Sequence, residues 1–244
     1  MCTKFTIVTV CLNSENVIEK TLLSVVNQTY KQFEYIVVDG ESKDDTLKII
    51  NKYKKSITKL VSEKDNGIYD AMNKGIDLAD NEWICFLNSG DFFKDNYVLE
   101  KLYDVIQKND ASIFYSDCEI INKNDEIISL YKTNHLDKKF HQQSTFYKKD
   151  LHNKFGYYLN SKKSTISDHI FFCQINPRNF YKVNFIISVY RNDGVSNTFF
   201  HGIQRNFFDF FMGYISLTNL FFLSFKLFKF FLKRIKNYFV TKMK

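Results

Sequence analysis

The first half of the chain alternates between two hydrophobic periods. Short runs rich in β-branched and aromatic residues predict strands at residues 4–10, 34–38, 59–62, 82–87 and 112–116. Between these runs, apolar residues recur every three or four positions, which predicts helices at residues 14–28, 44–54, 68–78 and 96–107. Strands that alternate with helices in this way form βαβ crossovers, so we expect an α/β fold built on a parallel sheet.

The alternation weakens after residue 117. Two β-rich runs, 118–121 and 126–131, flank the turn-forming residues 122–125, which predicts a hairpin. A strand at 144–147, a helix at 165–174 and a β-rich segment at 180–190 are predicted further on. No linker-like stretch separates the two halves, so we expect one domain over residues 1–204 and a distinct C-terminal segment over residues 205–244.

Charge is distributed unevenly along the sequence. The whole chain has a net charge of +7, and residues 205–244 hold eight basic residues and one acid. The first 204 residues carry 26 basic and 26 acidic residues and are therefore balanced. Because the excess positive charge belongs to the C-terminal segment, we do not expect a folded face that binds nucleic acid.

The cysteines and the N-terminal residues indicate the cellular compartment of the protein. The five cysteines are scattered and include no C-x-x-C pair, which is typical of buried, reduced thiols in a cytosolic protein. The apolar run at residues 5–12 is short and β-like, so we do not expect a signal peptide. These features predict a cytoplasmic location.

Carboxylates follow two of the predicted strands. Asp39 ends one β-rich run, and Asp91 follows another after the small residues Asn88, Ser89 and Gly90. In parallel sheets, ligands bind at the carboxyl ends of the strands. A carboxylate at the position of Asp39 can accept a hydrogen bond from a base or a ribose. Asp91 can hold Mg²⁺ or Mn²⁺ against a diphosphate, although an ordinary turn would also explain it.

Three further polar positions have both a functional and a structural interpretation. Asp65 opens a segment rich in polar and small residues, which is either a ligand-binding loop or a turn before an amphipathic helix. Ser42 could bind a ligand or cap the next helix. Asp168 lies at the start of a predicted helix, where it is either an N-terminal cap or a general base. The histidines lack metal-ligand spacing, and no Rossmann, P-loop or nucleophile-elbow motif is present.

Four segments, in this order, resemble glycosyltransferase family 2. They are residues 6–13, 28–46, 63–75 and 88–91, and a looser similarity continues through His141, Gln142 and Asp168 to residues 194–196. The resemblance implies a GT-A fold, in which a nucleotide-binding α/β sheet is joined to a mixed acceptor-side extension. It also implies a nucleotide-sugar donor, most often a UDP-sugar, and transfer with inversion at the anomeric carbon.

The resemblance further implies a role for individual residues. Val10, Asn13 and Asp39 would hold the nucleoside, with Asp39 facing the uracil, and Ser42, Asp65 and Asn73 would belong to the same nucleotide site. Asp91 would bind Mn²⁺ or Mg²⁺, and Asp168 would be the catalytic base. Two departures from the family pattern are Asn88, near the place of a first metal-binding acid, and Ser167, where a second acid often precedes the base.

The C-terminal segment is rich in phenylalanine and has a basic stripe. It holds eleven of the 26 phenylalanines, and its uncharged stretch at 210–225 is shorter than the about 20 residues needed to span a bilayer. Lys226, Lys229, Lys233 and Lys236 recur at helical spacing beside bulky apolar positions. This pattern predicts a helix lying on an anionic inner-leaflet membrane surface. Alternatives are a helix packed on the body, an oligomer interface, or a re-entrant or spanning segment.

The leading hypothesis is therefore an inverting glycosyltransferase with a lipid-linked glycan acceptor, in surface polysaccharide or lipooligosaccharide synthesis. One alternative is a catalytically inactive, membrane-attached nucleotide-sugar-binding protein. Another is a methyltransferase that uses Asp39 on a ribose, which would normally carry a glycine-rich fingerprint that this chain lacks. The sequence makes no prediction of the oligomeric state.

Overall fold

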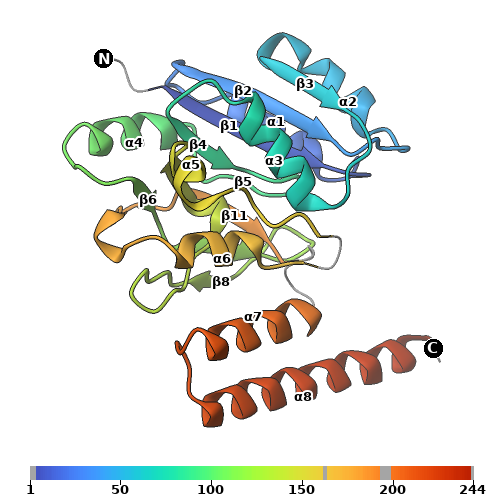
Figure 1. Cartoon of the computed structure of the whole chain (residues 1–244). Helices are drawn as coiled ribbons and strands as arrows, with labels where there is room; N and C mark the ends of the chain where they lie inside the picture. The colour runs from blue at the N-terminus through green and yellow to red at the C-terminus, as the bar shows by residue number, and fades with distance from the viewer. Residues whose placement is uncertain (1–3, 162–163, 193–198, 243–244) are drawn as a thin grey trace.

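A seven-stranded sheet runs through the centre of the protein (Figure 1). The computed structural model describes residues 4–161, 164–192 and 199–242, with side chains described in the last range for residues 200–229. In spatial order the strands are β10 (Phe180–Lys182), β6 (Ile113–Tyr115), β9 (Thr145–Lys148), β4 (Trp83–Phe86), β1 (Phe5–Cys11), β2 (Phe33–Asp39) and β3 (Lys59–Ser62). β1 to β4 pair in parallel, as predicted, and β9 runs antiparallel between β4 and β6.

Helices cover both faces of this sheet because successive residues of its strands point to opposite sides. Val8 and Val10 of β1 pack with Tyr69 and Met72 of α3, whereas Ile7 belongs to a second apolar cluster on the other face. The helices of the first half are α1 (Ile18–Val26), α2 (Thr46–Lys52), α3 (Ile68–Leu78) and α4 (Val98–Ile106), with a 3-10 turn η1 (Lys54–Ser56) after α2. The predicted α/β fold is confirmed.

A second, four-stranded sheet lies beside the first. Its strands, in order, are β5 (Phe92–Phe93), β11 (Ser188–Arg191), β7 (Cys118–Ile121) and β8 (Ile127–Tyr131). β7 and β8 form the predicted hairpin. The predicted β-rich segment 180–190 is divided between the two sheets, because β10 pairs with β6 and β11 pairs with β5 and β7. After β10 in the main sheet, the chain therefore crosses to β11, which pairs with β5, the strand that follows β4.

Shorter elements complete the acceptor-side half. They are η2 (Gln142–Ser144), α5 (Leu151–Phe155), α6 (Ser167–Cys173) and η3 (Pro177–Asn179). α5 and the two-residue β5 were not predicted, because segments this short show no hydrophobic period. Cys11, Cys85, Cys118 and Cys173 are free and buried, as predicted; Cys2 lies outside the described residues.

The chain ends in a helical hairpin formed by α7 (Phe199–Phe211) and α8 (Leu217–Lys242), which lies on one side of the body (Figure 1). A Cβ on Gly202 would lie 2.7 Å from Leu227 Cδ1, so the two helices approach closely where α7 has a glycine. The boundary predicted between residues 204 and 205 falls inside α7. Throughout the described ranges, we find no helix with the length and apolar character of a membrane span.

Candidate active site

A cavity of about 580 Å³ opens at the carboxyl end of β1. Its wall includes Val10 near the end of β1 and Asn13 just after it, Asp65 and Ile68 before and at the start of α3, and Asp91 after β4. This is the edge at which parallel sheets bind ligands. We call it the donor-side cavity. Four residues predicted to bind nucleotide or metal, Val10, Asn13, Asp65 and Asp91, therefore line one space.

Asp39 and Ser42 are not part of the wall of this cavity. The Asp39 carboxylate is fully buried and accepts hydrogen bonds from the Ser42 backbone N–H (3.0 Å), the Ser42 hydroxyl and the Ser62 hydroxyl (2.7 Å). Ser42 Oγ in turn accepts from the backbone N–H of Asn13 (2.8 Å), which has a left-handed φ of 47°. In this structure Asp39 holds the loop that presents Asn13, and its direct contact with a base stays a prediction.

Asp65 reaches over the end of β2. Its Oδ1 accepts a hydrogen bond from the Gly67 N–H (2.9 Å). A Cβ built on Gly40 would lie 2.3 Å from Asp65 Oδ2, closer than any real contact. Because Gly40, the residue after Asp39, has no side chain, the Asp65 carboxylate can occupy the space beside it.

Asn73 lies outside the lining of this cavity, and its role in the nucleotide site stays a prediction. Its Nδ2 donates to the Tyr158 carbonyl (2.9 Å), and its Oδ1 accepts from the Tyr158 N–H (3.1 Å). The reason is helical geometry: Ile68 and Ala71, three residues apart, line the cavity, and position 73 faces elsewhere on α3. Asn73 therefore anchors the chain at residue 158.

Asp91 and Asn88 present oxygen atoms where a metal is predicted. Asp91 is 4% exposed, and its Oδ1 accepts from the Arg191 backbone N–H (3.0 Å). Asn88 Oδ1 is buried without a hydrogen-bond partner. The described residues contain no cluster of three or more His, Cys, Asp or Glu side chains that could hold a metal. One carboxylate and one amide oxygen still fit Mg²⁺ or Mn²⁺, which take few protein ligands and complete their shell with phosphate oxygens and water.

A second cavity, of about 230 Å³, adjoins the first. Both are lined by Ile68, Asn88, Gln143 and Tyr190. We call this second space the acceptor-side cavity. Asp168, the second residue of α6, lies in its wall. The predicted base and the predicted metal ligand thus line two spaces that meet at shared residues.

The acceptor-side cavity also has histidine and aromatic residues in its wall. The Tyr69 hydroxyl donates a hydrogen bond to Asp168 Oδ1 (2.6 Å). Burial, and then the charge of Asp168, raise the pKa of Tyr69 well above its usual value, so the phenol remains a proton donor. His141 and, from α7, His201 and Arg205 complete much of the wall.

The family profile of Glycosyl transferase family 2 matches residues 6–183. The chain belongs to glycosyltransferase family 2. The match includes Asp39, Asp91 and Asp168 and ends before β11 and α7, which supply Tyr190, Arg191, His201 and Arg205 to the two cavities.

Curated relatives in this family differ in their named substrates. A "PGL/p-HBAD biosynthesis glycosyltransferase" of Mycobacterium bovis is 29% identical over 204 residues, which is 80% of this chain and 79% of that protein. An Escherichia coli "UDP-Glc:alpha-D-GlcNAc-diphosphoundecaprenol beta-1,3-glucosyltransferase", WfgD, is 34% identical over 113 residues, 46% of this chain and 44% of WfgD.

Solved structures show the same GT-A type of fold. Residues 1–349 of S. aureus TarS, crystallised with UDP-GlcNAc, superpose with a TM-score of 0.67 at 20% identity over 79% of this chain. The mannosyltransferase PcManGT of Pyrobaculum calidifontis, in complex with GDP-Man and Mn²⁺, gives 0.61 at 15% identity over 83%. This chain spans 59% and 60% of those two solved chains.

In this family 2 chain, sequence reasoning missed Arg191 and gave His141 no role. Arg191 lines the donor-side cavity 100 residues after Asp91, to which its backbone is hydrogen bonded. The pairing of β11 with β5 brings them together, and a two-residue strand gives no sequence signal. Arg205 was assigned to the C-terminal segment because of local charge alone, although it lines the acceptor-side cavity.

Proposed function

We propose that this protein is an inverting glycosyltransferase that moves a sugar from a nucleotide sugar to a hydroxyl of a lipid-linked glycan acceptor. The observation that carries the proposal is the junction of the two cavities. Asp91 lines one and Asp168 the other, and Asn88 and Tyr190 line both. A donor held on one side and a hydroxyl held on the other would meet at this junction.

The donor-side cavity has the size and polarity for a nucleotide sugar. Its volume of about 580 Å³ lies within the roughly 300–1,000 Å³ of small-molecule sites. Asn13 and Asp65 offer polar groups to a nucleoside, and Arg191, whose guanidinium is ion-paired with Asp125 and keeps an unpaired Nε, lines the same cavity. A UDP-sugar is the favoured donor, since UDP stands in the names of both WfgD and the TarS complex.

The mechanism is direct displacement at the anomeric carbon. Asp168 takes the proton of an acceptor hydroxyl as the oxygen attacks the face opposite the leaving diphosphate, which inverts the configuration. Tyr69 fixes the orientation of the Asp168 carboxylate through its hydrogen bond. A divalent cation, Mn²⁺ or Mg²⁺, held by Asp91 and Asn88 would supply positive charge to the leaving group.

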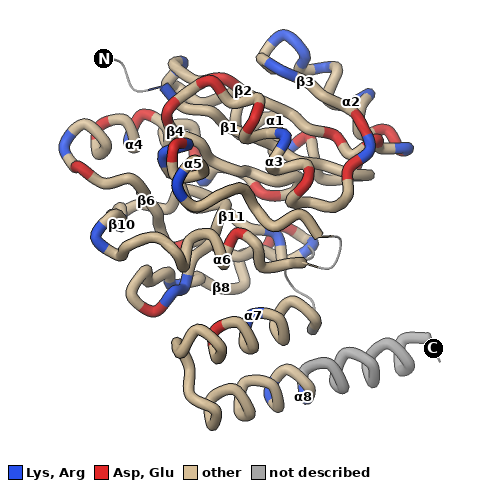
Figure 2. Tube along the Cα trace, in the orientation of Figure 1, with Lys and Arg blue, Asp and Glu red and all other residues tan. Residues whose placement is uncertain are grey.

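The helical hairpin is proposed to lie on the inner face of the plasma membrane. Its exposed large apolar side chains in the described part are Phe200, Phe207, Phe211, Met212, Tyr214, Leu217, Phe221, Phe222, Phe225 and Phe228. Lys226 and Lys229 are exposed beside them, and the side chains of Lys233 and Lys236 lie outside those described. Figure 2 shows acids and bases interspersed over the body, whereas the described part of the hairpin is mostly uncharged.

This surface composition favours a lipid interface. Soluble monomers rarely expose so many neighbouring apolar side chains, and a helix that is apolar on one side and basic on another binds anionic bilayers. A membrane-bound enzyme can reach an acceptor carried on a lipid, which is the class of acceptor in the name of WfgD.

A donor panel tests the proposed activity. The full-length protein is incubated with UDP-Glc, UDP-GlcNAc, UDP-Gal and GDP-Man, with Mn²⁺, Mg²⁺ or EDTA, and release of the nucleoside diphosphate is measured. We expect metal-dependent hydrolysis of at least one UDP-sugar. Binding of UDP-sugars without turnover under every condition, including with added acceptor lipids, would instead favour the inactive binding protein.

A further inference from the structure

Unpaired buried polar atoms gather along the two cavities. Among the described residues, five buried side-chain polar atoms lack a hydrogen-bond partner. Three of them belong to Arg191, Asn88 and His141, which line the donor-side cavity, the junction and the acceptor-side cavity respectively. Since nearly all buried polar groups in proteins are paired, this concentration indicates a ligand that supplies the missing partners.

His141 is the acceptor-side member of this set. Its Nδ1 is unpaired, and its ring packs edge-on against Tyr190 (4.6 Å between centroids) and Tyr131 (5.7 Å). Burial lowers the pKa of His141 to about 4, despite the opposing effect of the Asp168 charge. The imidazole is therefore neutral near pH 7, and its unpaired Nδ1 can donate or accept one hydrogen bond, depending on the tautomer.

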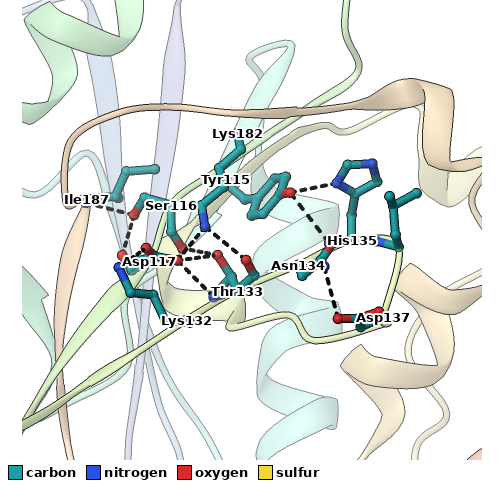
Figure 3. A network of polar contacts seen from close by, with 11 residues as sticks. Tyr115, Ser116, Asp117, Lys132, Thr133, Asn134, His135, Asp137, Lys182 and Ile187 are labelled. Atoms are coloured by element: carbon teal, nitrogen blue, oxygen red, sulfur yellow. Dashed lines mark hydrogen bonds and ion pairs between the residues drawn. The ribbon is translucent and has the colours of Figure 1, made fainter.

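The chain leading to His141 is held by a polar network (Figure 3). Asp117 accepts hydrogen bonds from Lys182 (2.6 Å) and from the Thr133 N–H (2.8 Å), and the Tyr115 hydroxyl is hydrogen bonded to His135 (2.6 Å). Beyond it, the His141 carbonyl accepts from Ser144 N–H (3.0 Å) and Thr145 Oγ1 (2.8 Å). The backbone of His141 is thus fixed on both sides, while Nδ1 of its side chain is left unpaired.

His152 shows what a purely structural histidine looks like in this protein. It is also buried, and burial lowers its pKa to about 4 as well. However, its Nε2 is hydrogen bonded to the Tyr147 hydroxyl (3.0 Å) and its Nδ1 to the Gly156 carbonyl (3.0 Å). It lies outside the lining of both cavities. The fold therefore supplies hydrogen-bond partners to both ring nitrogens of His152 and none to Nδ1 of His141.

We infer that His141 hydrogen-bonds a second hydroxyl of the acceptor group whose first hydroxyl Asp168 deprotonates, and that this group is a single sugar ring. The inference rests on the proposed function and adds the acceptor class. The cavity of about 230 Å³ is smaller than sites for drug-sized ligands, roughly 300–1,000 Å³, so it admits one ring. Asp168 and His141 in one wall select a ring that carries at least two hydroxyls.

The test compares His141→Phe, His141→Asn and His141→Gln with His152→Phe. Phenylalanine keeps the aromatic packing and removes the nitrogens, while asparagine and glutamine each place an amide near one ring nitrogen. Transfer to p-nitrophenyl monoglycosides of glucose, galactose, N-acetylglucosamine, mannose and rhamnose is measured with the active donor. Donor hydrolysis without acceptor and the Tm of each variant are measured in parallel.

We expect His141→Phe to raise the KM for the glycoside about tenfold, because one buried hydrogen bond is lost. The KM for the donor in the hydrolysis assay should stay within about threefold of wild type, because His141 does not line the donor-side cavity, and the Tm should stay equal or rise because an unpaired atom is removed. One of the two amide variants should raise the KM for the glycoside less than His141→Phe does. His152→Phe should lower the Tm, because it leaves Tyr147 and Gly156 unpaired.

Normal transfer by His141→Phe would overturn the inference, and so would a parallel loss of Tm, hydrolysis and transfer. Failure of the wild type to hydrolyse any nucleotide sugar would count against the proposed function instead. In that case calorimetric titration of the same glycosides into the UDP-saturated protein still decides the role of His141. Binding that is lost in His141→Phe supports it, and absent or unchanged binding contradicts it.

Discussion

The hydroxyl of Tyr69 donates a 2.6 Å hydrogen bond to Oδ1 of Asp168, across 99 residues of sequence. Tyr69 is the second residue of α3, and Asp168 is the second residue of α6. Each lies in the first turn of its helix, and both line the acceptor-side cavity. The pair therefore joins the nucleotide-binding half to the element that carries the proposed base.

Tyr69→Phe should lower kcat for transfer about tenfold, because the Asp168 carboxylate loses the group that orients it and one hydrogen bond is worth about 0.5–1.5 kcal/mol. The KM for the donor should not change, since the phenol does not line the donor-side cavity. Steady-state kinetics with varied donor and acceptor measure both. A change in donor KM with kcat unaltered would contradict the positioning role.

Asp168→Asn should lower transfer by about 10²–10⁴-fold, the usual contribution of a general base. The amide is the same size and still accepts the Tyr69 hydrogen bond, so UDP binding and Tm should match the wild type. Transfer assays and calorimetry with UDP give the comparison. Wild-type turnover by this variant would remove Asp168 from the mechanism.

Asp91→Asn should make turnover require more Mn²⁺, since a neutral amide replaces the carboxylate of the proposed site. Asn88→Asp is the matched variant: it adds a carboxylate at the unpaired Asn88 oxygen and should lower the Mn²⁺ concentration needed. Metal titrations of donor hydrolysis after EDTA treatment measure the two shifts. Identical metal curves for all three proteins would disprove this site.

Asp117 should stabilise the fold at neutral pH and lose this effect in acid. Burial opposes its charge, but hydrogen bonds led by those from Lys182 and the Thr133 N–H lower the pKa of Asp117 from 3.8 to about 2. Because this pKa is lower in the folded than in the unfolded state, the ionised carboxylate stabilises the fold at pH values above the unfolded pKa. This stabilisation, about 2 kcal/mol, is lost as the pH falls from about 4 through 2.

Asp117→Asn should accordingly unfold more easily than the wild type at pH 7, and the difference should shrink towards pH 2. Urea unfolding at several pH values measures it. The exposed Asp104→Asn serves as the control and should unfold like the wild type at every pH. A stability difference that does not depend on pH would mean that the Asp117 charge contributes nothing.

The hairpin should bind vesicles that contain phosphatidylserine and bind neutral vesicles more weakly. Lys226→Gln with Lys229→Gln should weaken the anionic binding about 30-fold, at about 1 kcal/mol for each lysine near the surface. The exposed body residues Lys54 and Lys55, changed in the same way, provide the charge-matched control. Equal effects of the two pairs in a vesicle sedimentation assay would argue against membrane contact by the hairpin.

The sequence was most informative where hydrophobic period and strand ends coincide. The parallel core and the shared cavity of Val10, Asn13, Asp65 and Asp91 follow from that pattern. Asn73 lies outside the cavity lining because a motif shows which residues are neighbours in the chain, whereas the turn of the helix decides which of them face a cavity.

Arg191 and His141 could not be assigned to the site from local sequence. Arg191 reaches it because β11 pairs with β5, which is two residues long and follows no pattern. His141 stands out only when the partners of every buried polar atom are known, and those partners come from distant parts of the chain.

α7 belongs to two surfaces at once. His201, Arg205 and Phe208 recur at helical spacing, and the first two line the acceptor-side cavity, while Phe200, Phe207 and Phe211 are exposed elsewhere on the same helix. Asp209 also accepts a hydrogen bond from His169, the neighbour of Asp168 (2.8 Å). A shortened protein that stops before Arg205, made to improve solubility, would thus lose part of the wall of the acceptor-side cavity together with the exposed phenylalanines.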